Sequence, residues 1–208
     1  YEDAAGNLWV SGWGYFGVFN PKALTFRPTK TDIKGLVSIY EDQTDPDVMW
    51  LMGLLGIHKY DKKQDVIIKH FEPQENDDNS LSAKFIYDVH RDELGLFWLT
   101  SLGGGLDIFD PSTESFTHYQ HDANDSQSIS SNTAATVFFD SKDRIWIGTD
   151  VGLDRFDPET KTFSHYSTAD SFLQNLVWGM VEDNAGNLWI KTTRHRLVKF
   201  NPEAGIGK

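Results

Sequence analysis

Seven histidines are the side chains of this sequence best suited to bind a metal ion or to move a proton at neutral pH. Three of them, His70, His118 and His165, each precede an aromatic residue in matching stretches of the sequence. No pair of histidines has the spacing of a zinc site, and no helix is predicted that could hold one. Because the three positions recur with a repeat described below, we interpret them as structural. We predict no metal site and no cofactor.

The 31 acidic residues could supply calcium ligands or the carboxylate pair of a glycosidase or lyase. The acidic linkers 75–79 and 122–125 lack the spaced Asp pattern and the distal Glu of a calcium loop, so we interpret them as solvated loops. Many other acidic side chains recur at equivalent turn positions, such as Asp42, Asp140 and Asp183, whereas an active site needs asymmetry. We therefore predict no catalytic residue in this chain.

Two loops break the repeat and are the candidate binding residues. Residues 12–17 add the aromatic side chains of Trp13 and Tyr15, and residues 192–196 add Arg194 and His195 to an acidic protein. Exposed aromatic rings can stack on sugar rings, and an arginine pairs through two hydrogen bonds with a carboxylate such as that of a uronic acid. Our hypothesis is that these four residues contribute to a surface that binds a ligand or partner. The alternative is ordinary variation between loops.

The elements that would position these residues are indicated by five of the seven tryptophans. Their spacings are 41, 48, 48 and 43 residues, and each follows an acidic turn and lies in a short apolar stretch. A period of this length indicates a solenoid, a propeller or an array. We expect each of these tryptophans to pack between neighbouring repeats. They are Trp9, Trp50, Trp98, Trp146 and Trp189.

Each repeat contains about four short stretches rich in aromatic and β-branched residues, separated by turn residues, and no stretch has helical periodicity. Four copies have an Asx-Pro turn after the third stretch, and the second copy has Asp61-Lys62 there instead. Four antiparallel strands in about 45 residues are typical of a β-propeller blade. The predicted fold class is therefore all-β, a β-propeller fragment with about five four-stranded blades.

The predicted blades cover residues 1–34, 35–80, 81–130, 131–173 and 174–208 of a single propeller region. The first and last blades are expected to be incomplete. The first has only Tyr1 left of its first strand, and the last ends after its third strand, at Asn201-Pro202. Three arrangements stay open: five blades that close on themselves, two chains that complete each other, or a parent protein with more blades on both sides.

Composition limits the possible partners. The net charge is −12, which opposes binding to nucleic acid or to an anionic membrane. No apolar run approaches the length of a membrane span, so we expect no direct membrane contact from this segment. There is no cysteine, which excludes disulfides and thiolate chemistry. The chain begins without Met in what we predict to be a strand, so we expect it to be a piece of a longer protein.

The repeat resembles the two-component regulator propeller repeat. The match is carried by residues 183–190 (DNAGNLWI), 145–158 (IWIGTDVGLDRFDP) and 103–111 (GGGLDIFDP), and by the linker 120–126. The resemblance covers essentially the whole chain, is strong in the third and fourth copies, and is weaker in the second.

Proteins of this family are typically sensors whose propellers lie outside the inner membrane and whose output is commonly a histidine kinase or a diguanylate cyclase. Known inputs are often breakdown products of polysaccharides. The resemblance thus implies a periplasmic input module that binds an oligosaccharide or other small ligand and self-associates as a dimer. It implies no enzyme activity in this fragment, although the parent protein would carry the output domain.

Two other functions remain open from the sequence. A propeller hydrolase or lyase acting on polysaccharide would need a non-repeating cluster of carboxylates or a His–Tyr pair. A protein-interaction scaffold like the WD-repeat proteins is the third reading, but the Gly-His and Trp-Asp marks of that family are missing.

Overall fold

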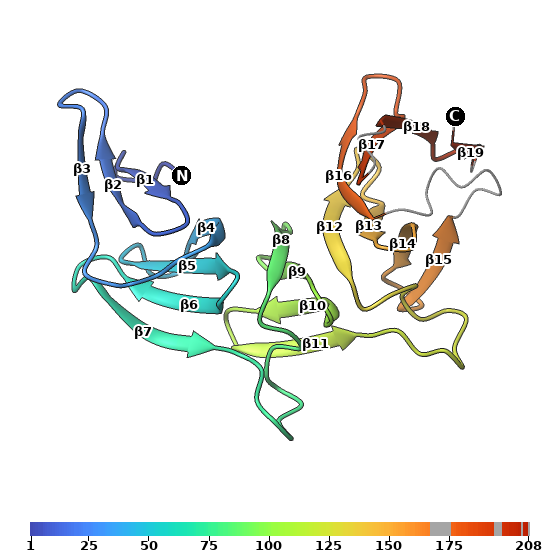
Figure 1. The fold of residues 1–208 in the computed structure, drawn as a ribbon, viewed down its shortest axis with the longest axis horizontal. Coiled ribbons are helices and arrows are strands. Elements are labelled where there is room, and N and C mark those ends of the chain that lie inside the picture. The colour runs from blue at the N-terminus through green and yellow to red at the C-terminus, as the bar shows by residue number, and fades with distance from the viewer. Residues whose placement is uncertain (167–175, 194–196, 205, 208) are drawn as a thin grey trace. The chain divides into compact units, whose positions relative to one another are not determined.

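The computed structural model describes residues 1–166, 176–193, 197–204 and 206–207. In these residues, antiparallel strands form five sheets, and neighbouring strands within each sheet follow chain order (Figure 1). The first sheet has three strands, β1 (Leu8–Ser11), β2 (Phe16–Asn20) and β3 (Thr25–Pro28). The second has β4 (Leu36–Glu41), β5 (Val48–Gly53), β6 (Gly56–Asp61) and β7 (Val66–Phe71).

The other three sheets repeat this four-stranded pattern. The third contains β8 (Ile86–Arg91), β9 (Phe97–Ser101), β10 (Gly105–Asp110) and β11 (Ser115–Tyr119). The fourth contains β12 (Ala134–Phe139), β13 (Ile145–Thr149), β14 (Leu153–Asp157) and β15 (Thr162–Tyr166). The fifth contains β16 (Val177–Glu182), β17 (Leu188–Thr192), β18 (Leu197–Asn201) and β19 (Ile206–Gly207). One sheet falls within each predicted blade range, and the all-β propeller class is confirmed.

The chain divides into two compact units, Tyr1–Ile86 and Tyr87–Lys208, and each is described by itself. The first unit holds the first two sheets, and the second holds the other three, apart from the first residue of β8. In the part of the chain that the structure describes, no helix is long and apolar enough to cross a membrane.

The two ends of the chain differ in how well the sequence predicted them. Tyr1 pairs with Trp9 through two backbone hydrogen bonds of 2.7 and 3.0 Å, as expected for the remnant of a first strand. The expectation that the last blade ends after its third strand is wrong, because β19 pairs with β18. The side chain of Asn201 accepts a hydrogen bond from the backbone N–H of Glu203 (2.9 Å), so the chain reverses and Ile206 returns opposite Asn201.

The acidic turn before each repeat tryptophan is held by one aspartate. In the fourth sheet, Asp140 Oδ1 accepts the backbone N–H groups of Lys142 (2.9 Å) and Arg144 (3.0 Å), and Oδ2 accepts the indole N–H of Trp146 (2.8 Å). A buried indole N–H needs such an acceptor. We call this arrangement the Asp–Trp clamp. It recurs in every sheet, at 2.7–3.0 Å, as Asp3–Trp9, Asp42–Trp50, Asp92–Trp98, Asp140–Trp146 and Asp183–Trp189.

The clamped tryptophans join neighbouring sheets inside each unit. Trp9 lies in one core cluster with Met49 and Leu51 of the second sheet. Trp98 packs edge-on against Phe156 (5.5 Å between ring centroids), and Trp146 packs in the same way against Phe200 (5.5 Å). Packing between blades is thus confirmed for these three tryptophans. Trp189, in the last sheet, is partly exposed, and Lys199 Nζ lies over its ring, 5.4 Å from the ring centroid.

A glutamate from the following sheet also holds the acidic turn. Glu41, the last residue of β4, accepts the backbone N–H of Ala4 (2.9 Å) in the turn of the first sheet. Glu182, at the matching end of β16, accepts the backbone N–H of Ser141 (2.7 Å). These bonds fix the clamp of the first sheet to the second sheet, and the clamp of the fourth sheet to the fifth sheet.

We predict that Asp140→Asn destabilises the second unit by about 2–4 kcal/mol, because an amide presents N–H groups to Trp146 or to the turn and leaves Arg144 without its carboxylate. Burial raises the pKa of Asp140, but hydrogen bonds from Trp146 and Arg144 outweigh it and lower the pKa below its ordinary value. The stabilising effect of ionised Asp140 is therefore full above pH about 4 and is lost as pH falls further.

Denaturant unfolding at pH 7 and at pH 3 measures both effects. The control is Asp143→Asn in the same turn, where the exposed residue has a φ of 58° that Asn tolerates. Equal stability of the two variants at pH 7 would contradict the clamp, as would a difference that does not shrink in acid.

Candidate functional site

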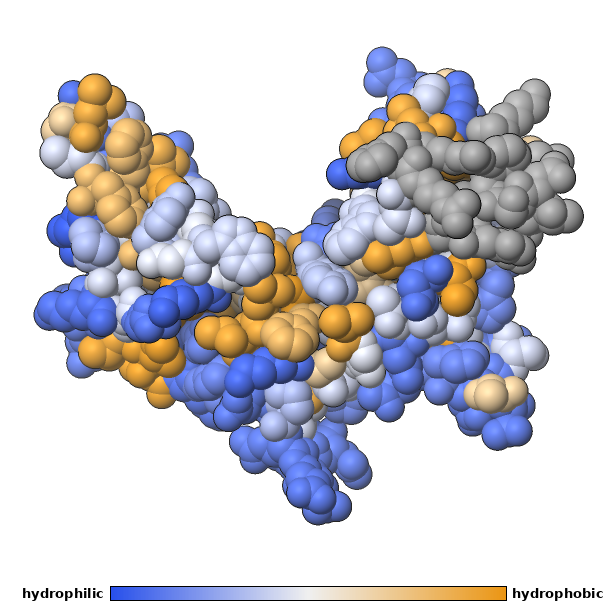
Figure 2. Space-filling view, in the orientation of Figure 1, coloured by the Kyte–Doolittle hydropathy of each residue, from blue (hydrophilic) through white to orange (hydrophobic). Residues whose placement is uncertain are grey.

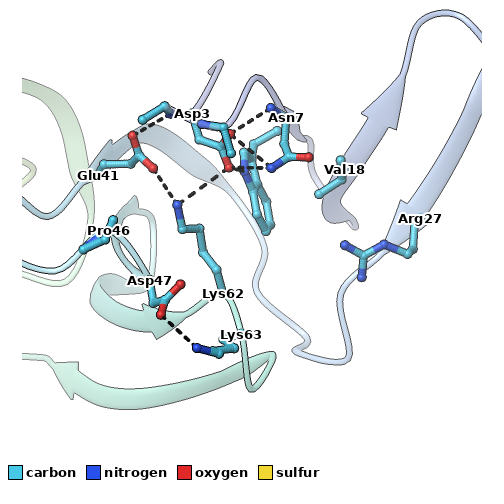
Figure 3. A pocket seen from close by; sticks show the side chains of 12 residues that line it. Asp3, Asn7, Val18, Arg27, Glu41, Pro46, Asp47, Lys62 and Lys63 are labelled. Carbon is cyan, nitrogen blue, oxygen red and sulfur yellow. Dashed lines mark hydrogen bonds and ion pairs between the residues drawn. The ribbon is translucent and has the colours of Figure 1, made fainter.

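A charged hollow lies between the first and second sheets, within the first unit (Figure 3). Its volume is about 510 Å³, which lies within the range of small-molecule sites. The acidic turn of the first sheet forms one side, and the turns at the ends of β4 and β6 form the other. The lining includes Asp3, Trp9, Arg27, Glu41, Asp47, Lys62 and Lys63.

Lys62 lies at the centre of this hollow. Its Nζ is 2.5 Å from Glu41 Oε1 and 3.7 Å from Asp3 Oδ2, and its side chain is only 13% exposed. Asp3 is the clamp aspartate of the first sheet, so Lys62 ties that clamp to the second sheet. The other four repeats have Pro at this position, and the second repeat alone has a lysine. The departure from the Asx-Pro pattern therefore creates the buried cation.

Asp61 makes the turn without the proline. Its Oδ1 accepts the backbone N–H groups of Lys63 (2.8 Å) and Gln64 (2.7 Å). The Asx residues of the other four copies accept equivalent bonds, which confirms the predicted turn chemistry. The position after the Asx residue is consequently free to carry a side chain other than proline.

The electrostatics of the hollow favour ionised carboxylates. Burial raises the pKa of both Asp3 and Glu41, but hydrogen bonds from Trp9 and Asn7 to Asp3, and from Lys62 to Glu41, outweigh it and lower both pKa values. A glycosidase needs one carboxyl group with a raised pKa to protonate the leaving group. The pKa values of these two groups are shifted in the opposite direction, so neither is suited to be the general acid of a glycosidase.

Arg27 and Lys63 form the outer part of the hollow. The guanidinium of Arg27, from β3, reaches toward the open space in Figure 3. Lys63 makes a loose ion pair with Asp47, with 3.5 Å between Nζ and Oδ2, and both side chains are largely exposed. Exposed ion pairs hold their partners weakly, so these groups remain able to turn toward a polar ligand.

The predicted binding residues are only partly placed. Trp13 is 82% exposed and Tyr15 is 51% exposed, both in the loop between β1 and β2. Tyr15 packs edge-on against Phe26 (5.6 Å) and lines a second hollow of about 240 Å³. A Cβ on Gly12 would lie 2.4 Å from the Tyr15 ring, so any larger residue there would displace this ring. Arg194 and His195 lie outside the described residues. The hypothesis that they form one binding surface with Trp13 and Tyr15 therefore stays a prediction.

Hydrophobic side chains gather near this loop. Figure 2 shows them over the hairpin of β2 and β3, where Leu24 is 78% exposed and Phe26 is 41% exposed. Together with Trp13 and Tyr15, they give the first sheet an exposed aromatic and aliphatic surface.

The histidines have structural partners in two sheets. His118 Nδ1 lies 2.7 Å from Asp107 Oδ1, and His165 Nδ1 lies 2.8 Å from Asp154 Oδ1. Both aspartates are 1% exposed. Each lies on the third strand of its sheet, directly opposite its histidine on the fourth strand. These contacts agree with the structural interpretation of His118 and His165. The described residues contain no group of three or more His, Asp or Glu side chains placed to hold a metal ion.

The second sheet replaces this pair with two histidines. His58 lies opposite His70, in the register that Asp107 and Asp154 have elsewhere, and the rings stack at 4.3 Å between centroids. His58 is 6% exposed, and neither ring nitrogen has a hydrogen-bond partner among the described residues. Burial, with a further contribution from His70 and Lys84, lowers the pKa of His58 to about 4.

Sequence reasoning missed Lys62, Glu41 and Arg27. The missing proline after Asp61 was a visible signal for Lys62. Glu41 and Arg27 carry no comparable signal, because their role depends on contacts between two sheets.

Four sheets of four antiparallel strands and one of three, each with its strands in chain order and an Asp–Trp clamp, define part of a β-propeller. Residues 171–194 match the family model described as "Two component regulator propeller". This match includes β16, β17 and the clamp of Asp183 and Trp189. It confirms the resemblance stated from the sequence for this segment of the chain, which belongs to the fifth copy of the repeat. A comparison with curated proteins found no significant match.

Solved propellers are similar over nearly the whole chain. One is the extracellular domain assigned to a hybrid two component system, BT3049, from B. thetaiotaomicron (TM-score 0.77, 19% identity, 100% of this chain and 29% of that chain). A second is the extracellular domain assigned to a one component system, BT4673, from the same organism (TM-score 0.76, 20% identity, 100% and 29%). A third is the WD40 β-propeller domain of Doa1 (TM-score 0.64, 11% identity, 95% and 61%). At these identities the likeness establishes the fold, and this chain spans 29% of each of the first two domains.

We predict that His58→Asp stabilises the first unit by about 1 kcal/mol at pH 6, because it recreates the Asp–His pair of the third and fourth sheets. Denaturant unfolding at pH 6 measures it, with His58→Asn as the uncharged control. An equal gain for Asn, or no gain for Asp, would contradict the pairing.

We predict that Lys62→Met destabilises the first unit by about 2–3 kcal/mol, because it leaves Asp3 and Glu41 as neighbouring buried carboxylates without a cation. Lys63→Met is the matched control, since its side chain is 77% exposed and its loss should change stability by at most about 0.5 kcal/mol. Both variants are compared by denaturant unfolding at pH 7. Similar stability of the two would show that Lys62 does not hold the sheets together.

Proposed function

We propose that this chain is part of the extracytoplasmic input domain of a signalling protein, and that it binds a ligand without chemically changing it. The observation that carries this proposal is the likeness of the full chain to extracellular domains of two B. thetaiotaomicron signalling systems. The family repeat at residues 171–194 supports the same assignment.

The tuning of the carboxyl groups supports binding over catalysis. Among the described residues, every Asp or Glu side chain with a shifted pKa has it lowered, which keeps the group ionised. The clamp aspartates are already used by the fold. A hydrolase or lyase needs a carboxyl group or another acid that can give up a proton near neutral pH.

The proposed ligand is an oligosaccharide released from a polysaccharide, and the proposed location is the periplasm. The output domain of the parent protein would be a histidine kinase or a diguanylate cyclase, and signalling would run through a dimer. The exposed rings of Trp13 and Tyr15 support the ligand class, because such rings offer apolar faces to a sugar.

We predict that at least one mixture of neutral oligosaccharides raises the unfolding temperature of the 208-residue chain, since a ligand that binds only the folded state stabilises it. The probes are partial hydrolysates of starch, cellulose, xylan, arabinan, mannan and galactan, with thermal unfolding followed by fluorescence. The double variant Trp13→Ala/Tyr15→Ala should reduce the shift. Leu94→Ala, which removes an 83% exposed side chain elsewhere, should keep it.

The same samples test the enzyme alternative. Incubation of the chain with the intact polysaccharides should release no reducing ends and form no unsaturated sugars. Turnover would favour the hydrolase or lyase, and the absence of any stabilisation would contradict the proposed ligand class.

A further inference from the structure

Two aromatic side chains from different sheets meet in the second unit. Tyr87 lies on β8 and Trp178 lies on β16, with 5.6 Å between ring centroids and 61° between ring planes, an edge-to-face contact. Their strands are the first strands of the third and fifth sheets, so a complete sheet separates the two residues in the chain. Neither residue belongs to an Asp–Trp clamp.

The two residues occupy equivalent positions in the repeat. Each stands five residues before the clamp aspartate of its sheet, and Ala135 holds this position in the fourth sheet. The pairing register shifts at Ala134/Thr136 and at Val177/Gly179, so Ala135 and Trp178 are the extra residues of β-bulges. A bulge changes the direction in which a side chain points, so that it no longer follows the regular alternation between the two faces of the sheet. The small side chain of Ala135, on the sheet between them, leaves room for the two rings to meet.

The strands that carry this pair are fixed to their neighbours. Asp88, next to Tyr87, accepts hydrogen bonds from the Thr136 hydroxyl (2.8 Å) and from the backbone N–H of Val137 (3.1 Å) on β12. These bonds join the third sheet to the fourth. The position of the Tyr87 ring is thus set before any ligand arrives, which lowers the entropy cost of binding.

The pair remains open to solvent. Trp178 is 42% exposed although it contacts Tyr87, and a Cβ built on the adjacent Gly179 would meet no atom within 4 Å. Other tryptophans, such as Trp146, are buried by the next sheet. Trp178 therefore has a large apolar surface that the described part of the fold does not use.

We propose that Tyr87 and Trp178 form a stacking surface for one ring of a neutral oligosaccharide. The face of an aromatic ring is negative, and it attracts the weakly positive C–H groups on the face of a sugar ring, while the sugar hydroxyls stay in water. The net charge of −12 disfavours an anionic ring. This inference rests on the proposed function and assigns it a contact site in the second unit.

The test uses the full chain labelled with 5-fluorotryptophan and the neutral hydrolysates named above. The fluorine signal of Trp178 is identified as the one lost in Trp178→Phe. Titration should shift this signal, and calorimetry with the tightest purified oligosaccharide should show binding about ten-fold weaker or worse for Tyr87→Ala and Trp178→Ala. Tyr87→Phe and Trp178→Phe keep a ring and should bind within about three-fold of the original chain.

Val181→Ala is the matched control, since it removes a 62% exposed side chain from the same strand. Binding that survives Tyr87→Ala and Trp178→Ala unchanged would overturn this inference and leave the proposed function standing; a shift of the Trp13 signal alone would point to the loop of the first sheet instead. If no oligosaccharide binds the original chain, both the proposed ligand class and this inference fail.

Discussion

The hydrogen bond between an aspartate and a tryptophan is the interaction on which the rest of this structure depends. A tryptophan large enough to cover the gap between two sheets brings a polar N–H into an apolar interior, and that N–H must be paired. The aspartate supplies the acceptor and closes the preceding turn with its other oxygen, as Asp140 does for Trp146. One carboxylate thus sets the turn, the strand that follows it, and the position of the tryptophan against the next sheet.

Because the clamp fixes each sheet, positions outside it are free to differ between repeats. Lys62 replaces a proline and becomes a buried cation between two carboxylates. His58 replaces an aspartate and stacks on His70 without a hydrogen bond for either of its ring nitrogens. Tyr87 and Trp178 stand at the position that Ala135 holds in the fourth sheet, and their rings meet there. The repeated residues therefore build the fold, and the departures from the repeat are where this chain acquires individual properties.

Local patterns predicted most of the fold. The tryptophan period is visible in the sequence itself, and the Asx turns and the pairing of Tyr1 with Trp9 depend on residues close together in the chain. The two-residue strand β19 was missed because it is too short to show alternation. The contact of Glu41 with Ala4 and that of Tyr87 with Trp178 were missed because they join sheets, and residue spacing does not determine which side chains meet there. The candidate site was accordingly predicted less well than the fold.

The way carboxylates are used limits what chemistry the fold can support. A protein with 31 acidic residues has many carboxyl groups that acid–base catalysis could use. Here, hydrogen bonds from turns, indoles and lysines stabilise the ionised form of groups such as Asp3, Glu41 and Asp140, so these side chains keep their negative charge and cannot donate a proton at neutral pH. The same bonds that hold the blades together thereby make these groups unsuited to act as general acids. Under the proposed function, recognition falls to exposed aromatic faces, which bind through contact area and need no change of protonation.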